Sequence, residues 1–314
     1  MIMKTIIYIL VILCTTSTVR AQFTKNNLKL ESVTDQRKYH YQNLQLYPIY
    51  ANAAFAAEHK SVGKYVTLKD ALEEKKVAIT ESNGGEVNTL IIENTSKDTI
   101  MVLSGEVVQG GKQDRMIAQD FILYPKSGKK GISVFCVEHG RWQPKDQGME
   151  FKKYYTISSN EVRKAATIKK DQHEVWKKVA ETTDANKANT STGTLTALKE
   201  SGDFSKELKK YTDYFDNLIL PERDIIGVIA VSGDSILGCD MFATHDLLAE
   251  HYESLVNSYA TEAITTGKTV TILPEKVNQY LQTIIDDESK QEKEVQKKGT
   301  MLKDGKRKIH ISTF

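Results

Sequence analysis

The sequence predicts an α+β fold, in which a mainly antiparallel β-sheet or sandwich region is joined by a helical insertion and C-terminal helices. Between residues 39 and 138, short runs rich in Ile, Val, Leu and Phe follow one another, and the turns between them are too short for crossover helices. From residue 151 onward, apolar residues recur at helical spacing instead. The chain has 314 residues, 40% of them hydrophobic and 27% charged, so it is long enough to bury a sizeable core.

Residues 1–21 are predicted to form a cleaved signal peptide. Lys4 gives a positively charged start, residues 6–14 form an apolar run, and Val19-Arg20-Ala21 offers small residues where a signal peptidase cuts, so Gln22 becomes the mature N-terminus. The apolar run is shorter than the roughly 20 residues that a bilayer span needs, and an uncleaved anchor is the alternative. We therefore expect a secreted or periplasmic protein with no membrane attachment after cleavage.

The charge balance gives no indication of a nucleic-acid partner. Removing the leader removes two basic residues and no acidic one, so the 43 Lys and Arg become 41, equal to the 41 Asp and Glu. Basic residues are interleaved with acidic ones along the chain, whereas nucleic-acid binding needs a concentrated basic patch.

Two cysteines remain in the mature chain, Cys136 and Cys239. Each lies inside an apolar run, where a free cysteine behaves as a small hydrophobic residue. They are two buried thiols, or one disulfide in an oxidising compartment, or they include a reactive cysteine.

The first half of the mature chain is expected to form strands joined by short turns. A helix over residues 67–75 is also predicted there, because Thr67 is suited to cap its amino end. Asn83-Gly84-Gly85, Gly110-Gly111 and residues 125–128 mark turns. The expected strands cover residues 44–51, 77–80, 87–93, 99–108, 116–124 and 132–137.

A helical insertion is predicted at about residues 157–217. Ser159 is a candidate helix cap, and residues 182–201 are polar and small, which is typical of a loop. An apolar stripe at helical spacing follows this loop and predicts one buried helix face. The stripe consists of Phe204, Leu208, Tyr211, Phe215 and Leu218.

Beyond the insertion we expect a β-hairpin and two further helices. The hairpin strands cover residues 225–231 and 236–242. Thr244 is suited to cap the next helix, and Pro274 to begin another, because proline is favoured in a first helical turn.

The predicted organisation has three parts. The signal peptide occupies residues 1–21, and residues 22–285 form a single α+β domain that includes the helical insertion. Residues 286–314 are dense in charges of both signs, which favours a solvated C-terminal tail.

Motifs of common enzyme classes are missing from the sequence. We find no phosphate loop, no Gly-x-Ser-x-Gly elbow and no His-Glu-x-x-His. None of the seven histidines stands at a metal-ligand spacing with a third ligand nearby. We therefore expect neither a metal nor a cofactor, and whether the protein is an enzyme stays open.

Two polar clusters interrupt the apolar strands. The first holds Glu106 and the pair Gly110-Gly111, whose tight turn is expected to leave backbone amides open to an anion. The second follows a later strand, on which Cys136 and Glu138 share a face because side chains alternate. We predict that both clusters line one pocket for a polar or phosphorylated ligand. The predicted site residues are Glu106, Gly110, Gly111, Gln113, Arg115, Glu138, Arg141 and Trp142.

Two other interpretations of these clusters stay open. In a structural interpretation, Glu106 pairs with Arg115 and Glu138 with Arg141, and each pair only satisfies the end of a strand. In a catalytic interpretation, Glu106 or Glu138 is the general base of a hydrolase or transferase.

The chain resembles the ADP-ribosylglycohydrolase- and rhodanese-phosphatase-associated protein domain family, a domain family of unknown function. The similarity covers roughly residues 44–260, and Asp114 stands where the family has Asn. The motifs that carry it are Gly105-Glu106, Gly110-Gly111-Lys112-Gln113-x-Arg115 and Cys136-Val137-Glu138-x-Gly140-Arg141-Trp142. By association alone, the family name implies a link to ADP-ribose or phosphate-ester chemistry.

From these observations we expect an exported globular protein that binds a small polar or phosphorylated, nucleotide-like ligand related to ADP-ribose. A hydrolase or transferase acting on such a ligand is one alternative. A non-catalytic interaction module, in which both motifs are scaffold, is the other.

Overall fold

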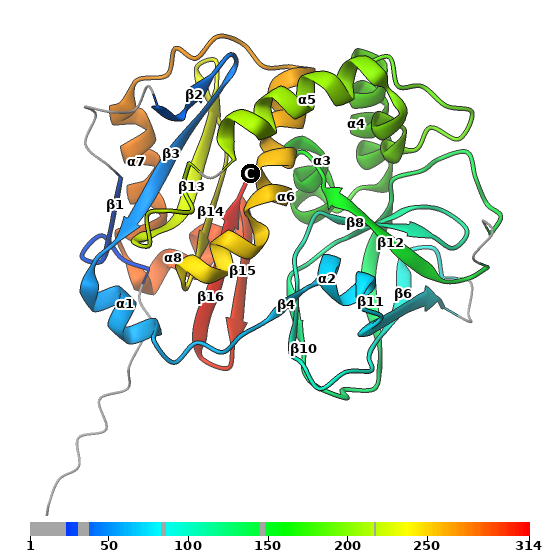
Figure 1. The fold of residues 1–314 in the computed structure, drawn as a ribbon, viewed down its shortest axis with the longest axis horizontal. Coiled ribbons are helices and arrows are strands. Elements are labelled where there is room, and N and C mark those ends of the chain that lie inside the picture. Colours follow the sequence, from blue (N-terminus) through cyan, green and yellow to red (C-terminus); the bar gives the residue numbers. More distant parts are fainter. Residues whose placement is uncertain (1–22, 31–37, 83–85, 145–147, 217) are drawn as a thin grey trace, which may run out of the picture.

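The computed structural model describes residues 23–30, 38–82, 86–144, 148–216 and 218–314. The predicted signal peptide and the predicted turn at residues 83–85 lie outside the described residues. Within the described ranges, no helix combines the length and the apolar character that crossing a membrane requires. Figure 1 shows two β-regions side by side with helices packed around them, which confirms the predicted α+β fold.

The larger β-region is an antiparallel sheet that contains both ends of the described chain. The predicted hairpin forms the middle of this sheet. The short strand β2 (His40–Tyr41) pairs with the beginning of β3, which starts at Leu44. Apart from β2, the sheet contains six strands. In spatial order they are β1 (Leu28–Leu30), β3 (Leu44–Ala51), the hairpin strands β13 (Ile225–Ser232) and β14 (Ser235–Phe242), β16 (Arg307–Thr313) and β15 (Gly299–Asp304).

The smaller β-region contains a six-stranded and a three-stranded sheet. The six-stranded sheet is antiparallel and runs in the order β12 (Phe151–Ile157), β8 (Glu106–Gly110), β9 (Arg115–Ile117), β11 (Lys129–Cys136), β6 (Thr89–Asn94) and β5 (Val77–Glu81). The three-stranded sheet consists of β10 (Phe121–Leu123), β7 (Ile100–Val102) and β4 (Val66–Thr67).

The helices lie mainly in the second half of the chain, as predicted. The predicted loop at residues 182–201 instead contains the end of helix α4, which ends at Ala185, and all of the 3₁₀-helix η3 at Leu195–Glu200. The α-helices are α1 (Ala53–His59), α2 (Leu68–Glu73), α3 (Asn160–Lys164), α4 (Gln172–Ala185), α5 (Gly202–Phe215), α6 (His245–Thr265), α7 (Pro274–Ile285) and α8 (Glu288–Gln296). A π-helix, η2 (Ala165–Lys169), and a 3₁₀-helix, η3 (Leu195–Glu200), complete the set in the described residues.

The predicted helix starts at Thr67 and Thr244 are confirmed by capping hydrogen bonds, whereas Ser159 precedes α3 without a side-chain capping bond. The Thr67 hydroxyl accepts a hydrogen bond from the Asp70 amide at 3.1 Å, and α2 begins at the next residue. The Thr244 hydroxyl accepts one from the Leu247 amide at 3.2 Å at the start of α6. Each bond satisfies one of the amides that a first helical turn leaves without an intrahelical partner.

Successive residues of β8 and β9 enter two different cores. Val108 and Ile117 join an apolar cluster with α2 on one face of the six-stranded sheet. Val107 and Met116 point to the other face and pack against the helical insertion. The buried helix α6 contacts β13 and β14 of one β-region and β12 of the other, so it joins the two regions.

Two predicted strands are each divided in the structure. The run at 99–108 forms β7 and β8, separated at Gly105, which has φ +91°. A Cβ atom at Gly105 would lie 2.7 Å from the Cγ of Arg163, so this approach requires glycine. The run at 116–124 forms β9 and β10. The halves of each run belong to different sheets, and a continuous apolar pattern does not reveal that exchange.

The predicted solvated tail at residues 286–314 is wrong. This segment forms α8, β15 and β16, and β16 pairs with β14 in the larger sheet. Val295, Ile309 and Ile311 are buried in the same core. Apart from the buried Lys308, the Asp, Glu, Lys and Arg side chains of this segment are exposed or partly exposed and alternate with these apolar positions, so the charge density hid three short amphipathic elements.

Cys136 and Cys239 are both free and fully buried, in β11 and β14 respectively. Burial raises the pKa of both thiols, because the thiolate loses its hydration in an apolar environment. This agrees with the interpretation of two buried thiols.

Candidate functional site

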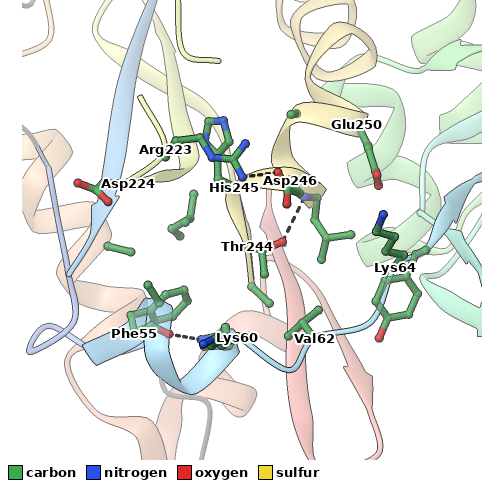
Figure 2. A pocket seen from close by; sticks show the side chains of 18 of the residues that line it. Phe55, Lys60, Val62, Lys64, Arg223, Asp224, Thr244, His245, Asp246 and Glu250 are labelled. Carbon is green, nitrogen blue, oxygen red and sulfur yellow. Dashed lines mark hydrogen bonds and ion pairs between the residues drawn. The ribbon is translucent and has the colours of Figure 1, made fainter. Parts of the chain in front are cut away.

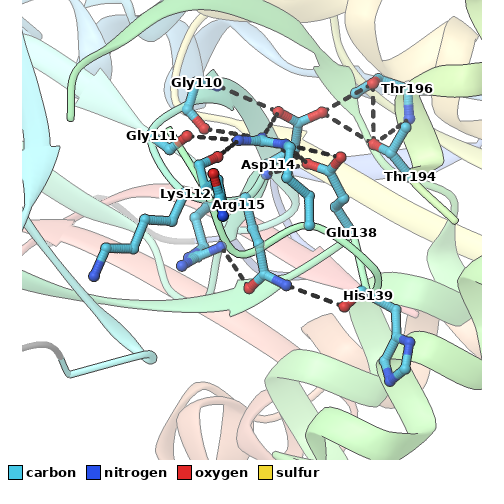
Figure 3. A network of polar contacts seen from close by, with 12 residues as sticks. Gly110, Gly111, Lys112, Asp114, Arg115, Glu138, His139, Thr194 and Thr196 are labelled. Carbon is cyan, nitrogen blue, oxygen red and sulfur yellow. Dashed lines mark hydrogen bonds and ion pairs between the residues drawn. The ribbon is translucent and has the colours of Figure 1, made fainter. Parts of the chain in front are cut away.

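The β8–β9 hairpin and the end of β11 bring most of the predicted site residues into one polar network, shown in Figure 3. Arg141 lies at its centre. The Arg141 Nε donates to both carboxylate oxygens of Glu138 at 3.0 Å. Its Nη2 donates to Glu138 Oε2 at 2.6 Å and to Asp114 Oδ1 at 3.3 Å. The predicted pairing of Glu138 with Arg141 is therefore present.

The remaining donors of Arg141 bind backbone carbonyls of the turn. Its Nη1 donates to the carbonyl oxygens of Gly111 at 2.6 Å and of Gln143 at 2.8 Å, and its Nη2 to that of Gly110 at 3.2 Å. Burial opposes ionisation of Glu138, but the bonds from Arg141 and from the Asp114 amide outweigh it and lower the pKa of Glu138. The guanidinium holds the turn closed and has no nitrogen left for a ligand.

The expectation that the glycine turn leaves amides open to an anion is wrong. Three successive amides of the turn already donate to protein oxygens. The amides of Gly110, Gly111 and Lys112 donate to Asp114 Oδ1 (3.2 Å), the Glu150 carbonyl (3.1 Å) and Glu81 Oε1 (2.7 Å), respectively. The turn is therefore bound by its own chain.

Asp114 connects this hairpin to the helical insertion. Its Oδ2 accepts hydrogen bonds from the hydroxyls of Thr194 at 3.0 Å and Thr196 at 2.9 Å, while its Oδ1 accepts from Gly110 and Arg141. A carboxylate can accept on both oxygens, whereas an asparagine offers only one. The four donors around this side chain therefore explain why a carboxylate suits position 114.

Arg115 is the member of the network with unused donors. Its side chain is fully buried, and its Nη1 donates to Gln113 Oε1 at 3.2 Å. Its Nη2 lies 3.7 Å from Glu81 Oε1, and neither Nη2 nor Nε has a hydrogen-bond partner among the described residues. Trp142, by contrast, is 49% exposed, and the Lys112 Nζ lies 5.0 Å from its ring centroid.

The structure does not place Glu106 in this network. Glu106 begins β8 and Gly110 ends it, which separates them by about 13 Å along the strand. The Glu106 Oε2 accepts from the Leu103 amide at 2.7 Å, and the side chain is fully buried. Burial raises the pKa of Glu106 to about 8. Glu106 is thus protonated at neutral pH, which does not suit a general base.

A separate cavity of about 610 Å³ lies at the amino end of α6 and is shown in Figure 2. We call it the α6 cavity. Its walls are α1, the segment at residues 60–65, residues 223–226 and the first turns of α6. None of the eight predicted site residues belongs to these walls, which come from segments about 170 residues apart in the chain.

His59 lines the α6 cavity and has an unused hydrogen-bonding atom. The ring is 1% exposed, and its Nδ1 lies 2.9 Å from the Phe55 carbonyl oxygen. The His59 and Phe55 rings are tilted by 31° with their centroids 3.9 Å apart. Burial lowers the pKa of His59, so the ring is neutral and carries its proton on Nδ1. Its Nε2 is then an acceptor, and it has no partner within the described part of the chain.

Charged side chains of both signs surround this cavity. Arg223 and Asp246 form an exposed ion pair at 2.6 Å, and Lys60, Lys64 and Glu250 also belong to the lining. Burial raises the pKa of Glu250. The cavity also receives the amino end of a 21-residue helix, which carries a partial positive charge.

Sequence reasoning missed His59 because it did not predict α1. One local signal was present: Asn52 precedes an alanine-rich segment, and its side chain accepts from the Phe55 amide at 2.9 Å. Asparagine is a favoured N-cap, so Asn52 indicated a short helix. Nothing local indicated that this helix would face α6.

The protein has an α+β fold, and its sequence motifs form a buried polar network. In this network Arg141 binds Glu138, Asp114 and the Gly110-Gly111 turn, and we call it the clamp. The sequence profile of the ARG and Rhodanese-Phosphatase-superfamily-associated Protein domain matches residues 32–311, and the chain belongs to this family. The family resemblance of the motifs is thereby confirmed. Searches of curated proteins and of solved structures each found no match.

Proposed function

We propose that this chain is an exported protein that binds a small, nucleotide-like ligand in the α6 cavity. The observation that carries the proposal is the buried, unpartnered Nε2 of His59 in the cavity wall. A buried acceptor without a partner costs about 1–3 kcal/mol. A ligand that donates an O–H or N–H to His59 removes this cost.

The other groups around the cavity favour an anionic group at a second point of the ligand. Lys60, Lys64 and Arg223 supply positive charge, and the amino end of α6 stabilises an anion through the helix dipole and free amides. Asp246 already pairs with Arg223. A ligand anion therefore competes with the Asp246 carboxylate for the Arg223 guanidinium. The volume of 610 Å³ falls within the range of small-molecule sites.

The family name and the leader sequence add two supporting arguments. The name associates the domain with ADP-ribosylglycohydrolase and a phosphatase superfamily, which suggests phosphate esters of ribose as the first probes. The leader at residues 1–21 supports export to a secreted or periplasmic location. Glu106 and Glu138, the candidate general bases, lie outside the cavity, so we propose binding without catalysis.

Thermal denaturation of the mature chain with ADP-ribose, AMP, ribose 5-phosphate and neutral ribose tests this proposal. A ligand present at 100 times its Kd stabilises the native state by about 2.7 kcal/mol, which corresponds to a rise of roughly 4 °C in Tm. We expect such a rise with at least one phosphorylated probe and none with ribose at equal concentration.

Two substitutions on one helix locate the binding. Ala56 is exposed and lines the cavity, whereas Ala54 is exposed on the same helix outside it. Ala56→Trp should abolish the rise in Tm, Ala54→Trp should leave it intact, and His59→Phe should weaken binding at least tenfold. A rise that survives Ala56→Trp, or no rise with any probe, would contradict the proposal.

A further inference from the structure

A second cavity, of about 690 Å³, lies between the smaller β-region, η2 and the start of β15. Its walls are residues 118–120, residues 133–135 of β11, the π-helix η2 and residues 296–301 at the start of β15. We call it the π-helix cavity. It shares no lining residue with the α6 cavity.

Six of the fifteen described residues that line the π-helix cavity carry neutral polar groups. These groups are the amides of Asn88, Gln119 and Gln296 and the hydroxyls of Ser133, Thr167 and Thr300. An amide offers a donor and an acceptor side by side, and a hydroxyl offers both on one atom. The lining can therefore bind a ligand that also donates and accepts at several neighbouring atoms.

Two charged residues and one aromatic ring also belong to the described lining, and the remaining lining residues are small or apolar. Asp120 and Lys170 carry the charges, and Phe135 of β11 provides a half-buried apolar surface. By comparison, six charged side chains line the α6 cavity. The two cavities therefore suit different ligand chemistry.

Asp120 is held rigidly and its charge is offset within the protein. Its Oδ1 accepts from the Ser104 amide at 2.7 Å, and its Oδ2 from the Thr300 hydroxyl at 2.9 Å. His310 Nδ1 lies 3.4 Å from the same Oδ2, and its Nε2 lies 3.0 Å from Asp240 Oδ1. Because an imidazolium between two carboxylates offsets their charge, and both Asp120 oxygens already have partners, Asp120 contributes little net negative charge to the cavity.

The π-helix that forms one wall is an irregular structure. Lys170 follows it with φ +54°, and its amide donates to the Ala165 carbonyl five residues back. A left-handed conformation is unfavourable for a lysine, and π-helical segments often lie at functional sites. The Thr167 hydroxyl reaches the Ala118 carbonyl at 3.5 Å, which ties η2 to the facing wall.

We infer that the π-helix cavity binds a neutral, polyhydroxylated ligand, that is, a sugar. Neighbouring sugar hydroxyls match the paired donors and acceptors of the amides, and the C–H face of a sugar ring packs on an aromatic ring such as Phe135. A phosphorylated sugar would bring a charge of about −2 into the cavity, where Lys170 is the one cationic side chain of the described lining. The inference is independent of the proposed ligand of the α6 cavity.

A panel of neutral mono- and disaccharides, presented as a glycan array to the labelled mature chain, tests the inference. Each sugar that binds is then measured by isothermal titration calorimetry, beside its 6-phosphate where one exists. We expect at least one neutral sugar to bind, and its phosphorylated form to bind at least tenfold more weakly.

Substitutions on β11 and on residue 119 then locate the bound sugar. Ser133 and Lys129 are both exposed on β11, but only Ser133 lines the cavity. Ser133→Trp should abolish binding and Lys129→Trp should not, while Gln119→Ala should weaken it at least tenfold. Ala56→Trp, which fills the α6 cavity, should leave sugar binding unchanged.

Three results with the parent chain and the Ser133 variant would overturn the inference, and a fourth comes from Ala56→Trp. They are the absence of binding to any neutral sugar at millimolar concentration by the folded parent, binding that survives Ser133→Trp, and tighter binding of the phosphorylated form. Loss of sugar binding in Ala56→Trp would assign the sugar to the α6 cavity instead, and would equally overturn it.

Discussion

Glu106→Gln should stabilise the protein at neutral pH, although it replaces a fully buried residue. The Glu106 carboxyl accepts from the Leu103 amide and is hydrogen-bonded to Tyr154, whose hydroxyl in turn contacts Ser254 Oγ at 3.2 Å. A protonated carboxyl can fill both roles, as acceptor through one oxygen and as donor to Tyr154 through the other. A glutamine amide has the same shape and the same two functions.

The size of the effect follows from the two pKa values. Burial raises the pKa of Glu106 from its usual 4.5 to about 8, so folding at pH 7 must first protonate this side chain. Each pH unit above 4.5 costs about 1.4 kcal/mol, which amounts to on the order of 3 kcal/mol at pH 7. Glutamine does not have this cost.

The sign of the pH dependence follows from the same linkage. Between pH 4.5 and 8 the unfolded parent binds fewer protons at Glu106 than the native parent, so this group lowers the free energy of unfolding as the pH rises. The variant lacks this contribution. The stability difference between variant and parent should therefore be under about 1 kcal/mol at pH 5 and grow by about 1.4 kcal/mol per unit towards pH 8.

Urea denaturation of parent and Glu106→Gln at pH 5, 6, 7 and 8 measures this difference, and equal m values confirm that the same surface is exposed. The ion pair with Arg115 that the sequence suggested gives the opposite result, because the substitution would leave a buried guanidinium unpaired. A loss of more than 1 kcal/mol at pH 7, or a difference that does not change with pH, would refute the reasoning.

Three further predictions concern the clamp, the thiols and the leader. Glu138→Gln should lower the free energy of unfolding by about 3–5 kcal/mol, because it leaves Arg141 with a weakened partner; a loss under 1 kcal/mol would contradict the clamp. Cys136 and Cys239 should react slowly with a thiol reagent in the native state and give two thiols after unfolding without reductant, whereas a count of zero would show a disulfide. Expression with the natural leader should give an intact mass that starts at Gln22, and a full-length mass from the cytoplasmic fraction would exclude cleavage.

The parts of the fold that the sequence predicted depend on local chemistry. Thr67 and Thr244 could be recognised as caps because a hydroxyl that accepts from an amide three residues on needs no tertiary partner. The β13–β14 hairpin was visible because two apolar runs flank a four-residue turn. In each case the interacting residues are close in sequence.

The parts that sequence reasoning missed depend on distant partners. The break at Gly105 becomes understandable only when Arg163, 58 residues later, occupies the space of the missing Cβ. The strand at residues 307–313 becomes a core strand because β14 has a free edge that accepts it. Local charge density at residues 286–314 contains no information about that edge.

The candidate site shows the same limitation in chemical terms. A sequence shows which residue types occur together, but not whether their donors and acceptors are already used. Glu138, Asp114 and Arg141 were prominent because they are charged and clustered, and they are clustered because they bind one another. A ligand site needs the opposite property, which is a polar atom that the fold leaves unpaired at a cavity wall. His59 Nε2 has that property, and only the meeting of α1 with the amino end of α6 reveals it.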